Sequence, residues 1–190
     1  MDITIDKTFS PTWEVRLVKD PSPNLVEYCY PGAIKGGIVD GVFVEICPST
    51  GDHWLASFSA GNKSPNAPSA VISMPNRDDI MVISCGEAYI VDAYEPRNWK
   101  HVKLMPVMGW GAIASRQMLL LWDFSRVIAF NGTGEIWKTP AISWDGITFV
   151  SADDDAATFD VWNAVTESHQ EATVELKTGI VKGGASPHLQ

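Results

Sequence analysis

The stretch "RVIAFNGTGEIWKTP" (126–140) combines an apolar run, a glycine-rich turn and a second strand-like run that ends in Trp-Lys. The stretch "AYIVDAYEPRNWKHV" (88–102) follows the same plan upstream. An ungapped alignment of the two places Trp99 on Trp137 and brings further apolar positions into agreement. Because both copies keep the same order of strands and turns, we interpret the stretch as one unit of a repeat rather than as an isolated hairpin.

The same order of strands and turns occurs on both sides of this pair. Upstream, "GVFVEICPSTGDHWLASF" (41–58) predicts one strand at 42–47 and another from His53. Downstream, strands are predicted at 147–151, 157–163 and 172–177. Helical spacing of apolar residues is nearly absent, and 163–172 is interpreted as a long hairpin loop or at most one helical turn. The pattern predicts roughly four antiparallel meanders, each about forty residues long, which is typical of propeller blades.

We therefore expect a single all-β domain over residues 1–190, with repeated antiparallel meanders in a propeller-like arrangement of about four small blades. The run "TWEVRLV" (12–18) is expected to complete the last sheet and to close the ring between the chain ends. Loops are expected at 20–24, 30–37 and 61–78, where Pro and Gly gather. A β-sandwich or an irregular barrel, built from the same strands, stays open as the alternative.

The charge balance restricts the classes of partner. The chain has 14 Lys and Arg against 23 Asp and Glu, so its formal net charge is −9. Nucleic acids and anionic membranes are bound through clustered basic residues, and we expect neither as a partner. A protein partner, a neutral small ligand or a glycan is compatible with this charge. The acidic start of the chain has no apolar core of signal-peptide length, which predicts a cytoplasmic protein.

The chemistry-bearing residues form no recognisable catalytic or metal-binding motif. Cys29, Cys47 and Cys85 are widely spaced and odd in number, so buried thiols are expected rather than a disulfide framework. The four histidines show no metal-ligand spacing. The acidic run "SADDDAATFD" (151–160) lacks a calcium-loop pattern and is interpreted as a solvated hairpin tip. We accordingly predict no catalytic residue, no metal and no cofactor.

The eight tryptophans are the most suggestive feature. Trp110 lies between two glycines in "GWGA", and Trp144 lies in "SWDG" beside a turn that Asp-Gly favours. An indole beside a tight turn is often partly exposed, where it stacks on sugars or flat apolar ligands. We predict Trp110, Trp144 and Asp145 as ligand-binding residues. The other six are expected in the core: Trp13, Trp54, Trp99, Trp122, Trp137 and Trp162.

Three segments of the last third of the chain carry a resemblance. They are "NGTGEIWKTP" (131–140), "ISWDGI" (142–147) and "VELKTGIVKGGASP" (174–187). This series of a glycine turn, a Trp strand, S-W-D-G and L-x-T-G resembles small uncharacterised bacterial β-propeller-like proteins. The motifs belong to turns and strands, so the resemblance implies a fold and no function.

For the function, we expect a non-enzymatic binding or interaction module of unknown ligand, because a repeat scaffold offers broad surfaces and loops. The alternative is a small-molecule or glycan hydrolase or lyase with a pocket at a blade rim. A third interpretation is a self-assembling structural protein. A catalytic site would show converging ionisable side chains with perturbed pKa values, whereas a binding module would show an exposed patch without them.

Overall fold

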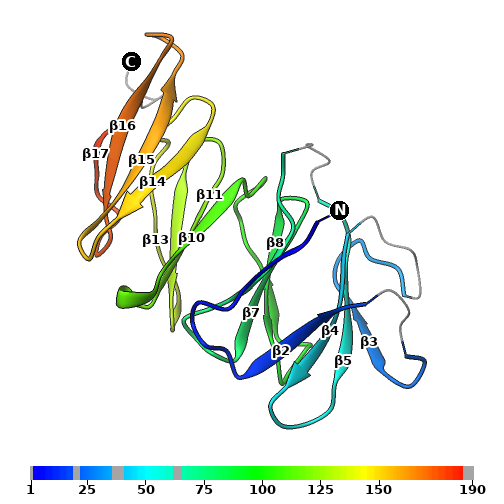
Figure 1. The fold of residues 1–190 in the computed structure, drawn as a ribbon. Helices are drawn as coiled ribbons and strands as arrows, with labels where there is room; N and C mark the ends of the chain where they lie inside the picture. Colours follow the sequence, from blue (N-terminus) through cyan, green and yellow to red (C-terminus); the bar gives the residue numbers. More distant parts are fainter. Residues whose placement is uncertain (1, 19–21, 36–40, 62–65, 186–190) are drawn as a thin grey trace. The chain divides into compact units, whose positions relative to one another are not determined.

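The computed structural model of the chain describes residues 2–18, 22–35, 41–61 and 66–185 (Figure 1). Its elements are β1 (Thr4–Asp6), β2 (Trp13–Leu17), β3 (Val26–Cys29), β4 (Val42–Pro48), β5 (Trp54–Phe58), β6 (Ala70–Ser73), β7 (Asp79–Ser84), β8 (Glu87–Asp92), β9 (Trp99–His101), β10 (Gly109–Ile113), the 3₁₀ helix η1 (Ala114–Arg116), β11 (Met118–Trp122), β12 (Val127–Asn131), β13 (Gly134–Lys138), β14 (Ile147–Ala152), β15 (Ala156–Asn163), β16 (Ser168–Glu175) and β17 (Val181–Gly183). These ranges contain no α-helix, which confirms the all-β prediction. None of the helices described is long and apolar enough to cross a membrane.

Three consecutive sheets contain a meander of four antiparallel strands: β6 to β9, β10 to β13, and β14 to β17. The first of these sheets has a fifth strand, β1, which runs parallel to β6 at its edge. Figure 1 shows the last of them in yellow to red. The last two strands of the first two meanders pair in the same register, because Ile90 pairs with Lys100 in one and Ile128 pairs with Lys138 in the other. The alignment of these strands from the sequence is therefore confirmed. The described strands form open sheets rather than a closed barrel.

The central hairpins of these two meanders, β7–β8 and β11–β12, differ in the length of their turns. The β7–β8 hairpin turns through Cys85 and Gly86, whose φ angles of 48° and 82° suit a two-residue turn. The β11–β12 hairpin needs residues 123–126, and the Asp123 carboxylate accepts hydrogen bonds from two backbone N–H groups there. The pairing of β11 with β12 is therefore offset by two residues from the pairing of β7 with β8. A shift of two keeps each side chain on its own face of the sheet, so the apolar pattern survives.

The sheet that contains the 41–58 hairpin is not a simple meander. Its strand order is β2-β4-β5-β3, and β3 runs parallel to β5. The prediction that 12–18 completes the last sheet is wrong, because β2 pairs with β4 whereas the last sheet consists of β14 to β17. The reason is apolar burial: Trp13 and Val15 lie in one core with the inward-facing residues of β4 and β5.

Two predicted loops contain strands. Residues 163–172 form no long loop, because β15 and β16 pair as far as Asn163 and Ser168 and only 164–167 turn the chain. Polar side chains on one face had masked this strand, whose other face buries Ala172 and Val174. The expected loop 61–78 contains β6, although 62–65 lie outside the described residues. The loops at 20–24 and 30–37 are described only in part.

The chain divides into two compact units, Met1–Pro106 and Val107–Gln190. The expectation of a single domain over 1–190 stays a prediction beside this division. In the first unit, Tyr30 stacks on Phe58 with ring centroids 4.3 Å apart. The indole N–H of Trp54 donates to the carbonyl oxygen of Ala93 across the two sheets (2.9 Å). A buried indole thus supplies apolar area while its polar group stays satisfied.

The second unit uses tryptophan in the same way. The Trp122 ring packs against Phe149 and Phe159, with centroids 5.9 Å and 5.7 Å away. The Trp137 indole N–H donates to the carbonyl oxygen of Leu176 (2.7 Å), and a Cβ on Gly179 would lie 2.8 Å from its ring. The Trp strand and the L-x-T-G segment of the last third of the chain therefore form one packing unit, in keeping with signatures of fold rather than chemistry.

Candidate functional site

The turn that carries Trp144 and Asp145 lies between β13 and β14. Both residues are exposed, Trp144 to 43%. Asp-Gly is common in hairpin turns, but this turn closes no hairpin, because β13 and β14 belong to different sheets. Gly146 nevertheless adopts the positive φ (106°) that the sequence predicted. The segment thus presents an indole and a carboxylate side by side at the link between two sheets.

Hydrogen bonds on both sides fix this turn. The backbone N–H of Trp144 donates to the carbonyl oxygen of Trp162 in β15 (3.0 Å), and the N–H of Gly146 donates to that of Phe124 (2.8 Å). The hydroxyl of Ser143, which is fully buried, accepts from the N–H of Trp162 (3.1 Å) and donates to the carbonyl of Gly146 (2.7 Å). The backbone beneath the exposed residues is therefore preorganised, which lowers the entropy cost of binding.

The side chain of Trp144 is used differently from the tryptophans of the cores. The indole N–H groups of Trp13, Trp54 and Trp137 each donate a hydrogen bond to a backbone carbonyl oxygen. Within the described part of the chain, the indole N–H of Trp144 has no hydrogen-bond partner. An exposed ring with an available donor is the combination that a ligand can use.

Trp110 lies on β10, at the edge of its sheet, opposite Leu121 in the register. Gly109 beside it has a packing role, since a Cβ at this position would lie 2.5 Å from the Trp122 ring, whereas a Cβ on Gly111 would meet only an ordinary contact at 3.6 Å. The "GWGA" pattern therefore reflects the close approach of a core tryptophan to the backbone. Trp110 itself is half-buried and engaged in a contact of its own. Its role in ligand binding stays a prediction.

The expectation for the remaining tryptophans holds in part. Trp13, Trp54 and Trp122 are buried, whereas Trp137 and Trp162 are half-buried. For Trp99 the core prediction is wrong, because the ring is 38% exposed. Trp99 lies on β9, the edge strand of its sheet, where one side of a residue has no neighbouring strand to cover it.

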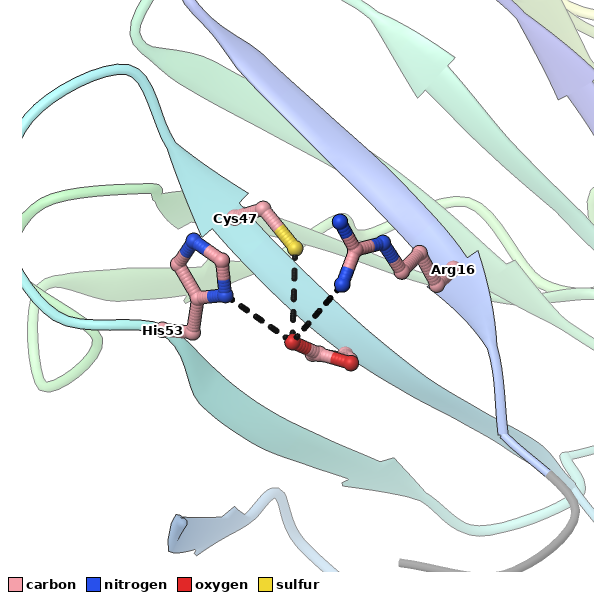
Figure 2. A network of polar contacts seen from close by, with 4 residues as sticks. Arg16, Cys47 and His53 are labelled. Carbon is pink, nitrogen blue, oxygen red and sulfur yellow. Dashed lines mark hydrogen bonds and ion pairs between the residues drawn. The ribbon is translucent and has the colours of Figure 1, made fainter. Parts of the chain in front are cut away.

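A polar network that the sequence interpretation missed lies on the face of β2 and β4 opposite their core residues, beside the turn that precedes β5. Glu45 and Cys47 are two residues apart on β4 and share a face. Arg16 pairs with Glu45 across the β2–β4 ladder, and residues 49–53 return the chain so that His53 lies beside them. Figure 2 shows Arg16, Cys47 and His53 directed at one carboxylate oxygen. That oxygen is Oε1 of Glu45.

The contacts of this network define its chemistry. His53 Nδ1 lies 3.0 Å from Glu45 Oε1, the Cys47 thiol donates to the same oxygen (3.6 Å), and an Arg16 nitrogen lies 3.6 Å away. Burial, and next the Glu45 charge, raise the pKa of the Cys47 thiol to about 11. A nucleophilic cysteine needs a lowered pKa and a base that takes its proton. The thiol here faces a carboxylate and stays protonated at neutral pH, so the arrangement does not activate it.

The signal for this network was present in the sequence in two parts. Glu-x-Cys in a strand places a carboxylate and a thiol on one face, and the turn "PSTGD" (48–52) brings the chain back at His53. Cys29, Cys47 and Cys85 carry thiols rather than disulfides in the structure. Burial was predicted for all three, but Cys29 is exposed and Cys85 is half-buried.

The other histidines and the acidic run behave as surface groups. His101 Nε2 lies 3.1 Å from Glu87 Oε1, and His169 Nδ1 lies 2.8 Å from Asp160 Oδ2. His188 lies outside the described residues. Residues 153–155 form the exposed tip of the β14–β15 hairpin, as predicted. There, two backbone N–H groups donate to Asp153 and hold the pKa of its carboxyl below the usual value.

Comparison with known proteins yields distant structural likeness and no family assignment. No family model matches the chain, and no curated protein matches it. A solved structure described as "Crystal structure of the eukaryotic initiation factor" aligns with a TM-score of 0.41 and 8% sequence identity. The alignment covers 76% of this chain and 40% of that one. A likeness this remote carries no argument about function, so the function is inferred from the residues themselves.

Proposed function

We propose that this protein is a non-enzymatic binding module that takes a neutral glycan at the turn formed by Trp144 and Asp145. The observation that carries the proposal is the exposed Trp144 ring, with an available indole N–H, on a backbone held by buried hydrogen bonds. An indole face stacks on the C–H face of a sugar, while its N–H and a neighbouring carboxylate bind hydroxyl groups. The net charge of −9 favours a neutral ligand over an anionic one.

We also propose that the four sheets are blades of a propeller-like scaffold and that the protein acts in the cytoplasm. The support for the scaffold is the repeated meander, with the same register in its last two strands, in residues 70–101 and 109–138. Stacking of such units protects their edges and faces, which gives the arrangement its physical motive. A β-sandwich built from the same sheets is the alternative, and a protein partner is the alternative ligand.

The hydrolase alternative has less support. Its best candidate nucleophile in the described residues is Cys47, and the raised pKa of that thiol opposes the role. The groups whose pKa values are shifted lie on several elements rather than around one reacting position: Cys29, Tyr30, Cys47, Asp79, Tyr89, Tyr94 and Asp153. A dispersed set of this kind is typical of structural burial and surface hydrogen bonds.

The test is a screen of immobilised neutral oligosaccharides with the wild-type protein, followed by titration of each bound sugar against Trp144→Ala and Asp145→Ala. We expect Trp144→Ala to weaken binding at least about tenfold, because a central aromatic contact is worth more than about 1.4 kcal/mol. Trp99→Phe is the matched control, since that ring is similarly exposed (38%) but packs on Tyr30 and Tyr89. Absence of any bound neutral sugar, or equal binding by wild type and Trp144→Ala, would refute the proposal.

A further inference from the structure

The network around Glu45 has the donor set of a metal centre. A carboxylate oxygen, a thiol sulfur and an imidazole nitrogen are brought together by Glu45, Cys47 and His53, and these three ligand atoms all lie within 4.8 Å of one another. Sulfur and imidazole are the ligands that distinguish Zn²⁺ sites from the all-oxygen sites of Ca²⁺ and Mg²⁺. The cluster therefore differs in kind from a group of surface carboxylates.

The spacing of the donor atoms also suits zinc. Ligands about 2.0–2.3 Å from Zn²⁺ in a tetrahedron lie about 3.3–3.7 Å from one another. Glu45 Oε1 lies 3.0 Å from His53 Nδ1 and 3.6 Å from Cys47 Sγ. The ligand atoms of His53 and Cys47 lie within 4.8 Å of each other, so side-chain rotations that shorten this separation would place the three atoms around one centre. Glu45 lies in the β4–β5 ladder opposite Leu55, Cys47 pairs with Glu14 of β2, and His53 directly precedes the paired Trp54, so the backbone of the two β4 ligands is held by strand pairing without a metal.

We propose that Glu45, Cys47 and His53 bind one Zn²⁺ ion, with the fourth coordination position left to water. This inference goes beyond the glycan-binding proposal and departs from the sequence expectation of no metal. Cys47 binds as the thiolate and releases its proton to the solvent, while His53 binds as the neutral imidazole. The metal joins the two ends of the turn between β4 and β5, residues 49–53, and so stabilises the folded state by an amount that grows with the logarithm of the free zinc concentration above its dissociation constant.

Arg16 modulates this site. Its guanidinium lies 3.6 Å from Glu45 Oε1, and its side chain is 66% exposed. A cation at this distance from the ligand oxygen repels Zn²⁺, yet the exposed side chain is free to turn into solvent when the metal binds. Removal of Arg16 should therefore increase zinc affinity. A gain of affinity on removal of a side chain separates a specific electrostatic role from general damage to the fold.

The chain contains a matched control for the cysteine. The sequence Val-Glu-x-Cys occurs twice, at 26–29 and at 44–47. Cys29 donates to Glu27 (3.7 Å) as Cys47 donates to Glu45, and both pairs lie in the same sheet. Among the described residues, however, no third metal-binding side chain forms a cluster with Glu27 and Cys29. Cys29→Ser should leave zinc binding unchanged.

The experiment is a titration of the tag-free, full-length protein with Zn²⁺ by calorimetry, repeated with Co²⁺ to detect the thiolate-to-cobalt charge-transfer band. We expect one equivalent of metal in the wild type, a loss of more than about a hundredfold in affinity for His53→Ala and Cys47→Ser, and a three- to tenfold gain for Arg16→Gln, about the size of an exposed charge interaction. His53→Ala alters an exposed side chain, so it keeps the test valid if Cys47→Ser folds poorly. Zinc should raise the melting temperature of the wild type and not of His53→Ala.

Two results would overturn the proposal. One is the absence of a Zn²⁺ complex, or of a charge-transfer band with Co²⁺, in the wild-type protein. The other is an affinity that His53→Ala leaves unchanged or that His169→Ala lowers as much, which would show adventitious binding to histidine–carboxylate pairs on the surface. Neither result bears on the glycan screen, because the turn at Trp144 lies in the other compact unit.

Discussion

Replacement of Ser143 by alanine tests whether buried hydrogen bonds fix the turn that presents Trp144. The Ser143 side chain is fully buried, and its hydroxyl joins two segments of the second unit. It accepts from the N–H of Trp162 (3.1 Å) and donates to the carbonyl of Gly146 (2.7 Å). Alanine removes both bonds and adds no bulk, so the variant isolates the contribution of the hydroxyl.

The expected cost follows from these two bonds. After the substitution, the N–H of Trp162 keeps only a long contact to the carbonyl of Gly146 (3.4 Å). A buried polar group that loses its partner costs about 1–3 kcal/mol, and the second group shares part of the same relaxation. We expect a loss of about 2–3 kcal/mol in the free energy of unfolding. For a chain of this length the melting temperature should fall by about 4–10 °C.

Urea unfolding followed by far-UV circular dichroism, together with calorimetry, measures this cost. Ser125→Ala is the matched control on the neighbouring turn, because its hydroxyl shares the carboxylate of Asp123 with two backbone N–H groups and should be nearly dispensable. We expect the control to change stability by less than about 0.5 kcal/mol. If Ser143→Ala were as stable as the control, the hydroxyl would not anchor the turn. Glycan affinity should fall in Ser143→Ala although Trp144 is retained.

Three further substitutions or titrations probe the packing and the surface. Gly179 has a φ of +73°, and an added Cβ would lie 2.8 Å from the Trp137 ring, so Gly179→Ala should lower the free energy of unfolding in urea by about 2–4 kcal/mol. Gly134→Ala, at φ +120° with open space around it, should cost only the backbone strain of about 1–2 kcal/mol. Equal costs would show that the clash with Trp137 does not contribute. Phe159→Ala opens a cavity at a fully buried position and should lose about 3–5 kcal/mol, or unfold the second unit, as followed by tryptophan fluorescence. The hydrogen bonds to Asp153 lower the pKa of its carboxyl in the folded state, so a carbon-detected NMR titration should give a pKa below 3.8. The stability that this carboxylate contributes is present above the unfolded-state pKa and is lost as the pH falls through the folded-state pKa. A measured pKa at or above 3.8 would contradict the hydrogen bonds assigned to it.

Local patterns in the sequence were sufficient for the repeat and for most strands. The alternation of apolar residues and the positions of Gly, Asn and Asp identified the strand pairs around Trp99 and Trp137, and the structure reproduces their register. These signals are local, because a period of two and a positive φ are properties of a few consecutive residues. The same locality explains the miss at 163–172, where a strand with one solvated face resembles a polar loop.

The strand order of the first unit lay beyond such signals. β2 pairs with β4 rather than with the last sheet, and β3 runs parallel to β5, because these pairings bury Trp13 and its neighbours in one core. A local sequence pattern cannot predict this strand order, because the order depends on how much apolar surface each of several distant partner strands would bury. The prediction of ring closure by 12–18 failed for this reason.

The candidate sites also combine features that follow from local sequence with features that depend on distant strand pairing. The order of residues along the chain was enough for the all-β class, the repeated meander and the acidic charge, and its Glu-x-Cys spacing already places Glu45 and Cys47 on one strand face. The contact of Arg16 with Glu45 and the anchoring of Trp144 by Ser143 against β15 depend on long-range strand pairing. The physical reason is that short-range conformational preferences act between neighbours along the chain, whereas a site is assembled by strand pairing and burial, which join residues that are distant in sequence.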